Sequence, residues 1–424
     1  MRQKMDNFGR KLYPILSIGF FLANLMMQYV FFKVFFINPG MNGDENGYFY
    51  YVSRHPDFSI SGISNAISQP YIFVCTLLNY IFHDTALTNR TVSLACGVFL
   101  LIYLFRYFKR HKFLSFVSTN PFFNDLTLFS LLFAVITIIR GHFVGTSDII
   151  SVAFAVPGFI LLTETIQSDS RKNLWYVGLL FALAFTSRPT FLVILLAYLS
   201  AFSVFYTTKL FSKAMLSTAI FFIFFTALIN FYPLLEHGKI VIDDKEPPVS
   251  SGTSWFEMNY LMAKKWDSGE LPRTKWLSSG DVIEFKKIHP EFIFPKNHLD
   301  IIKNDTGMFV RQMLRMFAIS MYSSIRFLYL LFPFLMLFAF RKKSSDERKT
   351  ARFTIMFYGI ALFLFMFMRL KMMEFRWMHI PMLFFAFYAM DCTKNSSEKT
   401  RLWLFNGTFL MGILFFVVGF FRDL

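Results

Sequence analysis

Long apolar runs alternate with short polar segments along most of this chain. Each run reaches or approaches the roughly 20 residues that an α-helix needs to cross the hydrocarbon core of a bilayer. The pattern predicts an all-α polytopic membrane protein with about eleven transmembrane helices. Their predicted ranges are 12–37, 91–106, 124–139, 148–165, 174–187, 190–207, 214–234, 316–340, 353–369, 377–391 and 402–421.

The composition agrees with a lipid environment. Of the 424 residues, 55% are hydrophobic and 17% are charged, whereas soluble domains carry about 25% charged residues. The net charge of +16 is compatible with nucleic-acid binding, but the basic residues lie in short clusters between apolar runs. This arrangement is typical of cytoplasmic loops in membrane proteins, so we predict no nucleic-acid partner. Cys75, Cys96 and Cys392 form no Cys-x-x-Cys pair, which predicts neither a disulfide framework nor a thiolate metal site.

Loop charge decides the placement of one ambiguous segment. Residues 70–83 are apolar but only about 14 residues long, short of a standard span. If they crossed the membrane, the cluster Arg106, Lys109, Arg110 and Lys112 would lie outside, against the positive-inside rule. We therefore predict an interfacial helix here and a cytoplasmic N-terminus. Phe, Ile, Lys and Asn usage favours a bacterium, so the predicted location is the plasma (inner) membrane, with multi-pass insertion.

Two long segments then face the outside of the cell. Residues 38–90 follow the first helix, and residues 235–315 carry mixed charge, Pro247-Pro248 and several aromatic residues. The second segment is too small to form an enzyme domain alone. The predicted organisation is a transmembrane module over 1–234, an outer-face loop region over 235–315 and C-terminal transmembrane helices over 316–424.

An acidic pair follows the first predicted helix directly. Asp44 and Glu45 lie within Asn42-Gly43-Asp44-Glu45-Asn46-Gly47-Tyr48. Mutual repulsion and partial burial would tune one of two adjacent carboxylates as a general base. The same residue types also form ordinary turns after helices. The residues alone leave both interpretations open.

Cationic side chains gather on the predicted outer side, where the positive-inside rule disfavours them. A phosphate-bearing lipid would explain them, because Arg presents forked donors to phosphate oxygens. Snorkelling or headgroup contact explains single members equally well. Together with Asp148, which opens the fourth predicted helix, the group comprises Arg54, His55, Arg90, Arg140, His142, Arg188, Arg369, Lys371, Arg376 and His379.

Cofactor motifs are absent from the sequence. The histidines His55, His142 and His379 match no metal-ligand spacing with Asp44 or Asp148, so a divalent metal has no support. Gly-rich phosphate loops and Gly-x-Ser-x-Gly elbows are also absent, so a nucleotide-dependent enzyme or a Ser hydrolase has no support. No cofactor is therefore predicted with certainty.

The order of these features resembles the GT-C glycosyltransferases. These polyprenyl-phosphate-sugar-dependent membrane enzymes include bacterial lipid A aminoarabinose transferases and protein O-mannosyltransferases. The likeness covers roughly residues 12–235, with a looser match at Arg376-Trp-Met-His379-Ile-Pro381, which is similar to the family's Arg-Tyr-x-x-Pro. Gln69, where some members have Lys, and Arg188-Pro189, without an intervening Gly, depart from the pattern and leave open which cation holds the donor phosphate. The matching motifs are Asp44-Glu45, Gln69-Pro70-Tyr71, Asn89-Arg90, Arg140 with Asp148, and Thr186-Ser187-Arg188-Pro189, similar to Thr-Lys-Gly-Pro.

The resemblance implies a GT-C-like fold with outer-face juxtamembrane helices. It implies inverting transfer of a sugar from a polyprenyl-phosphate donor to a hydroxyl of a glycan, lipid or protein acceptor, on the periplasmic or extracellular side. Asp44 would be the general base, with Glu45 as neighbour or alternate, and Asp148 would orient the acceptor or pair with an arginine. The outer loop would cover the acceptor. Candidates for binding the departing phosphate or the substrate are Arg90, Arg140, Arg188, Arg376 and His379.

Other classes of membrane protein remain open at this point. A transporter or lipid-linked-glycan flippase predicts ionisable residues in the middle of spans, and Arg326 is the main example here. A polysaccharide polymerase or ligase is a nearer alternative, but we would expect it to lack an acidic pair directly after the first span. A purely structural subunit leaves the outer charged group unexplained.

Overall fold

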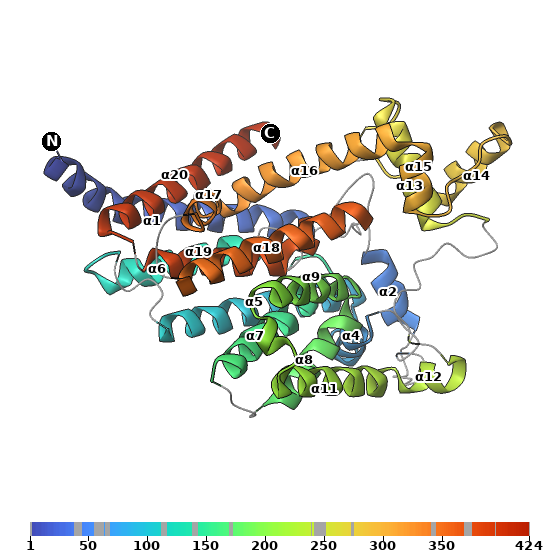
Figure 1. Ribbon diagram of the computed structural model, residues 1–424, viewed down its shortest axis with the longest axis horizontal. Coiled ribbons are helices and arrows are strands. Elements are labelled where there is room, and N and C mark those ends of the chain that lie inside the picture. Colours follow the sequence, from blue (N-terminus) through green and yellow to red (C-terminus); the bar gives the residue numbers. More distant parts are fainter. Residues whose placement is uncertain are drawn as a thin grey trace.

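The described part of the protein is helical, with no β-strand in it. A computed structural model gives the structure, which describes residues 2–37, 45–54, 63, 68–111, 117–137, 143–168, 173–238, 240, 252–272, 275–340, 345–368, 375–394 and 396–423. Figure 1 shows long helices running side by side, with a group of short helices at one end.

The N-terminal helices begin with α1 (Arg2–Phe31), which continues as a π-helix (Phe32–Ile37). They go on with α2 (Glu45–Arg54), α4 (Gln69–Phe82), α5 (Thr85–Arg110), α6 (Pro121–Thr137), α7 (Asp148–Ser168), α8 (Leu174–Ser187), α9 (Thr190–Phe205), α10 (Thr207–Leu210), α11 (Lys213–Ile229) and α12 (Phe231–His237). The later helices are α13 (Trp255–Asp267), α14 (Ser279–Ile288), α15 (His298–Asn304), α16 (Thr306–Leu328), α17 (Leu331–Phe338), α18 (Ser345–Met368), the 3-10 helix η3 (Phe375–Met378), α19 (His379–Thr393) and α20 (Glu398–Asp423).

Several helices are suited to a bilayer. Within the described residues, five helices are long and apolar enough to cross a membrane, and two bent helix pairs raise the number to seven. The apolar helices α4, α6, α8 and α9 are shorter. The protein is therefore a helical, multi-pass membrane protein, while the count of eleven spans and the GT-C fold stay predictions.

Two predicted spans are not continuous helices. Over 214–234, α11 and α12 meet at an angle of 67°, and over 316–340, α16 and α17 meet at 105°. A proline removes an N–H donor, and its ring clashes with the carbonyl of residue i−4. Pro233 lies four residues after Ile229, where α11 ends, and Pro333 lies four residues after Tyr329, the C-cap of α16. Proline chemistry thus explains both breaks.

The second break changes the position of Arg326. The sequence places this residue inside a continuous span, but the structure places it in the last turn of α16, next to the break at Tyr329. Tyr329 itself has a φ of 51°, in the left-handed region that L-residues rarely adopt. A charged side chain near a helix end is less surrounded by hydrocarbon than one in the middle of an unbroken span.

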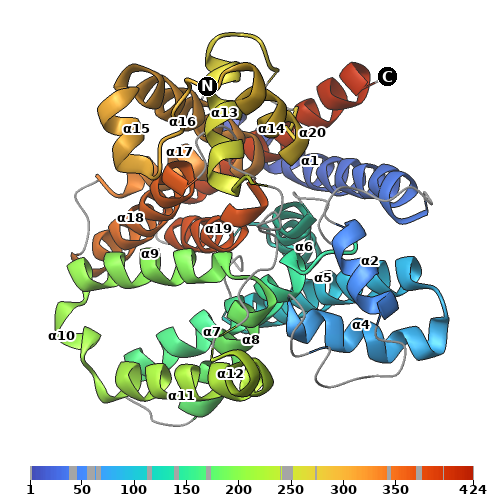
Figure 2. The same cartoon turned by 90° about the vertical axis from the view of Figure 1, so that its right-hand side faces the viewer.

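One large apolar core joins both halves of the chain. It extends from Tyr13 in α1 to Phe409 in α20. Figures 1 and 2 both show α1 beside α20, where a Cβ on Gly412 would overlap the ring of Phe20. Small residues at such crossings let membrane helices approach closely. The C-terminal helices are therefore packed into the same body as the N-terminal ones.

The outer-face region predicted over 235–315 contains α13, α14 and α15. Figure 1 shows them gathered at one end of the molecule, beside the N-terminal half of α16. Capping boxes at Ser254 with Glu257 and at Ser278 with Asp281 define where α13 and α14 begin. Asp267 anchors α13 to α16 through ion pairs to Arg311, at 2.6 Å, and Arg315, at 3.1 Å.

Candidate functional site

Charged residues from five separate segments meet where several helices begin or end. Glu45 opens α2, and Arg90 lies in the second turn of α5. Asp148 opens α7, Arg188 is the C-cap of α8, and Arg376 lies in η3. Figure 2 shows α2 lying over α5 and next to α4. Because antiparallel helices alternate in direction, starts and ends distant in sequence share one end of the bundle.

The first part of the site is a buried ion pair between Arg90 and Glu45. Nε and Nη2 of Arg90 each donate to one Glu45 oxygen, both at 3.1 Å, and the side chains are 3% and 0% exposed. Nη1 of Arg90 also donates to the carbonyl of Phe36, at 3.0 Å, and the backbone N–H of Gly145 donates to Glu45 at 2.6 Å. This pair joins the end of the first helix to α2, α5 and the turn before α7.

Close packing around this pair requires a glycine. A Cβ at Gly145 would lie 2.8 Å from Cβ of Asn89 and 3.3 Å from Oε1 of Glu45. Real Cβ atoms do not approach another carbon so closely, so the turn before α7 needs glycine to bring its N–H to the carboxylate. Both oxygens of Glu45 are thus engaged within the described residues.

The second part of the site is centred on Asp148. Its Oδ1 lies 3.0 Å from Nε of Arg188, and its Oδ2 lies 2.9 Å from Nη1 of Arg376. The hydroxyl of Thr146 donates to Oδ2 at 3.1 Å. The three charged side chains are between 10% and 18% exposed. One carboxylate therefore holds two guanidinium groups from distant parts of the chain.

Tyr48 connects the two parts. It lies three residues after Glu45 in α2, so both side chains share one helix face. Nη1 of Arg188 donates to its hydroxyl at 2.9 Å, and the same hydroxyl is 2.7 Å from Oγ of Ser147. Oγ of Ser68 donates to Ser147 at 2.9 Å. The polar cluster, defined as Glu45, Tyr48, Ser68, Arg90, Ser147, Asp148, Arg188 and Arg376, thus comprises two hydrogen-bonded groups that share α2 and the turn over residues 145–148.

Gln69 extends this cluster toward the break in the α11–α12 pair. Its Nε2 donates to Oδ1 of Asn230, the C-cap of α11, at 3.1 Å. Asn230 is fully buried. The break between α11 and α12 thus places the Asn230 side chain beside Gln69 at the start of α4.

His379 forms a hydrogen bond outside the polar cluster, although it lies close enough to Asp148 for electrostatic interaction. It is buried at the start of α19, with Nε2 3.1 Å from the carbonyl of Val135 in α6. Its hydrogen bond joins α19 to α6, and its role in substrate binding stays a prediction. The described residues contain no group of three or more His, Cys, Asp or Glu side chains arranged to hold a metal.

Several predicted site residues lie outside the described residues. These are the predicted base and five basic residues, namely Asp44, His55, Arg140, His142, Arg369 and Lys371; of Arg54, only the backbone is described.

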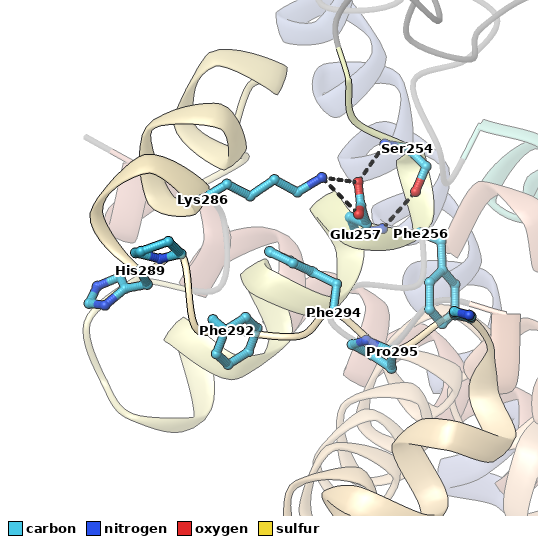
Figure 3. A pocket seen from close by; sticks show the side chains of 10 residues that line it. Ser254, Phe256, Glu257, Lys286, His289, Phe292, Phe294 and Pro295 are labelled. Carbon is cyan, nitrogen blue, oxygen red and sulfur yellow. Dashed lines mark hydrogen bonds and ion pairs between the residues drawn. The ribbon is translucent and has the colours of Figure 1, made fainter.

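A separate cavity of about 550 Å³ opens beside α13 and α14. Figure 3 shows Phe292 and Phe294 on one side of it, and Lys286 reaching across to Glu257. Nζ of Lys286 lies 2.9 and 3.0 Å from the two Glu257 oxygens. The ring of Phe292 meets that of Phe294 edge to face, with centroids 5.1 Å apart. Aromatic rings beside charged hydrogen-bonding groups suit a ligand with both apolar and hydroxylated faces.

Aromatic contacts connect this cavity to the helices of the membrane region. Phe256 lines the cavity and meets His298 edge to face at 5.1 Å, and His298 stacks on Phe367 in α18 at 4.6 Å. Burial against these rings lowers the pKa of His298, so a neutral imidazole is favoured there. Phe367 is nine residues before Arg376 in the sequence. Phe256 and His298 thus connect the cavity lining to α18.

Comparison with known protein families, curated proteins and solved structures gives no match. The function is therefore inferred from the residues and their geometry.

Proposed function

We propose that this protein is an integral-membrane glycosyltransferase that moves a sugar from a polyprenyl-phosphate donor to an acceptor hydroxyl. The observation that supports the proposal most is the polar cluster itself. Glu45, Arg90, Asp148, Arg188 and Arg376 come from five segments and are all candidates predicted from the sequence. Arg90 pairs with Glu45, and Arg188 and Arg376 both pair with Asp148. A buried arginine-rich site at the end of membrane helices suits a phosphate carried on a lipid.

In the proposed reaction, Asp44 takes the proton from the acceptor hydroxyl. The hydroxyl oxygen forms a bond to the anomeric carbon, and the bond from that carbon to the phosphate oxygen breaks. The electron pair leaves with the polyprenyl phosphate, and attack from the opposite face inverts the anomeric configuration. Asp44 directly precedes Glu45, whose position the Arg90 pair fixes. Glu45 is then a positioning residue rather than an alternate base.

The leaving phosphate gains charge as the bond breaks. Arg188 and Arg376 are the preferred candidates to stabilise this charge, because Arg90 donates to Glu45 through two nitrogens and to the Phe36 carbonyl through the third. Asp148 orients both guanidinium groups. Preorganised donors of this kind are often the largest single contribution to transition-state stabilisation.

We place the reaction on the outer face of the plasma membrane. The polar cluster contacts the carbonyl of Phe36, 26 residues after Arg10 near the basic start of the first helix. At 1.5 Å per residue this is about 39 Å, enough to cross a bilayer. A basic N-terminus favours the cytoplasm, so the cluster would face the opposite side.

Donor turnover tests the proposed function. Purified protein is incubated with a panel of labelled polyprenyl-phosphate sugars and a mixed cell-envelope extract as acceptor. The expected result is release of polyprenyl phosphate from one donor, together with transfer of its label to the extract. Absence of release with every donor, from protein that still binds these lipids, would contradict the proposal.

A transporter or lipid flippase is the second candidate. Broken helices are a common feature of transporter binding sites, and the break after α11 puts Asn230 next to the polar cluster through Gln69. The two candidates differ in one measurable outcome. In sealed proteoliposomes, a flippase moves intact lipid-linked sugar between leaflets without releasing polyprenyl phosphate.

The cavity beside Phe292 gives a prediction about the acceptor, for which we propose a saccharide. Phe292→Ala should raise the acceptor KM about 5- to 10-fold, corresponding to about 1–1.4 kcal/mol of lost ring contact, and leave the donor KM unchanged. Initial rates at varied acceptor and donor concentrations measure both constants. Phe122→Ala, which removes an exposed ring at the start of α6, is the matched control. An unchanged acceptor KM would remove this cavity from acceptor binding.

A further inference from the structure

A second cavity lies at the opposite ends of α5 and α7 from the polar cluster. Its volume is about 560 Å³. It is formed by the last three turns of α5, by His111 after that helix, and by two residues of α7. The lining residues are Phe99, Ile102, Tyr103, Arg106, Tyr107, Arg110, His111, Leu161 and Glu164.

The α5 residues form two rows along the helix. Ile102, Arg106 and Arg110 follow one another at intervals of four residues, so they share one face. Phe99, Tyr103 and Tyr107 form the neighbouring row with the same spacing. Each row is apolar at one end and polar at the other. Phe99 and Ile102 are 54% and 46% exposed, so the apolar ends face the surroundings of the helix bundle.

The position of the cavity across the membrane follows from helix geometry. Arg106 and Arg110 lie 16 and 20 residues after Arg90 in the same helix. At 1.5 Å per residue they are about 24 and 30 Å from the level of the polar cluster. The hydrocarbon core is about 30 Å thick. The two guanidinium groups therefore lie at the opposite membrane boundary, where phospholipid headgroups are found.

The cavity has an excess of positive charge. Arg106 and Arg110 are exposed, and neither forms a salt bridge with another described residue. The only carboxylate in the lining is Glu164, whose Oε1 lies 3.8 Å from Nε2 of His111. Two guanidinium groups against one carboxylate leave a net positive site even with a neutral imidazole.

We propose that this cavity binds an anionic glycerophospholipid. The phosphate lies between the guanidinium groups of Arg106 and Arg110, which provide charge-assisted donors. The acyl chains follow the exposed side chains of Phe99 and Ile102 toward the bilayer centre. Basic pockets between membrane helices are suited to such headgroups. The inference is independent of the proposed glycosyl transfer, since it uses neither the polar cluster nor a sugar donor.

Competition between two lipids on the wild-type protein tests the site. Protein purified in a neutral detergent is mixed with equal amounts of dioleoyl phosphatidylglycerol and dioleoyl phosphatidylcholine, and retained lipids are counted by native mass spectrometry. We expect at least about fivefold preference for phosphatidylglycerol, because two basic residues favour the anionic headgroup. Equal retention of the two lipids by the wild-type protein would overturn the proposal.

A double variant locates the preference. Arg106→Gln with Arg110→Gln should lower phosphatidylglycerol retention about tenfold or more, because both donors to the phosphate are lost. Lys109→Gln with Lys213→Gln removes the same charge from residues that do not line the cavity and should retain the wild-type preference. Circular dichroism and size exclusion verify that both variants fold. If both double variants lost the preference for phosphatidylglycerol equally, the preference would come from the overall positive charge of the protein. That result would overturn the proposed site.

Discussion

Asp44→Asn should lower the release of polyprenyl phosphate by about 10²- to 10⁴-fold, the range that general-base catalysis contributes. Asparagine has nearly the same shape as aspartate but cannot accept the proton of the acceptor hydroxyl. The labelled-donor release assay measures the rate with a donor that the wild-type protein turns over. Donor binding should change little, because in the proposed mechanism the arginines rather than Asp44 contact the phosphate.

Asp84→Asn is the matched control for this variant. Asp84 also precedes a helix at the same end of the bundle, and it caps α5 by accepting a hydrogen bond from the Leu87 N–H at 2.9 Å. Asparagine caps helices about as well as aspartate, so this variant should keep the wild-type rate. Equal release by Asp44→Asn and the wild-type protein would remove Asp44 from the mechanism.

Arg90→Met should lower the free energy of unfolding by about 3–5 kcal/mol, because it leaves the Glu45 carboxylate buried without its charged partner. Glu45 is fully buried, so water cannot replace the two lost hydrogen bonds without opening the junction of α2 and α5. Unfolding in mixed micelles of increasing denaturing-detergent content, followed by circular dichroism, measures the change.

Arg10→Met provides the comparison for this variant. Arg10 pairs with Glu398 at 2.9 Å, but the two side chains are 58% and 47% exposed. Exposed pairs contribute about 0–1 kcal/mol, so the loss should be small. Adding Glu45→Gln to Arg90→Met removes the uncompensated charge and should recover part of the stability. If Arg10→Met and Arg90→Met lowered the free energy of unfolding by similar amounts, burial of the Arg90–Glu45 pair would not increase its contribution to stability.

The apolar runs predicted the long helices. Most described residues of the predicted ranges are helical, and α8 has the predicted bounds, Leu174–Ser187. The breaks after Ile229 and Leu328 were missed, because hydropathy averages over a window and does not register a change of direction. Pro233 and Pro333 were the available signals, four and five residues beyond these two helix ends.

The charged members of the polar cluster were visible in the sequence because ionised groups near hydrocarbon are costly and therefore informative. Tyr48, Ser68 and Ser147 were missed, since neutral hydroxyls give no such signal. The spacing of Tyr48 three residues after Glu45 was the only local clue. The pairing of Glu45 with Arg90 could not be predicted, because it joins residues 45 positions apart that no periodic pattern relates.

The packing of α1 against α20 has a consequence for biosynthesis. The ribosome begins α20 about 370 residues after it completes α1. At about 5–20 residues per second, that interval is roughly 20–70 s. During it, the Gly9 carbonyl lacks the amide of Asn406, and the groove that receives Gly412 stays open. The nascent chain therefore carries an unfinished helix face throughout this interval, which is the period when a membrane chaperone or quality-control protease would meet it.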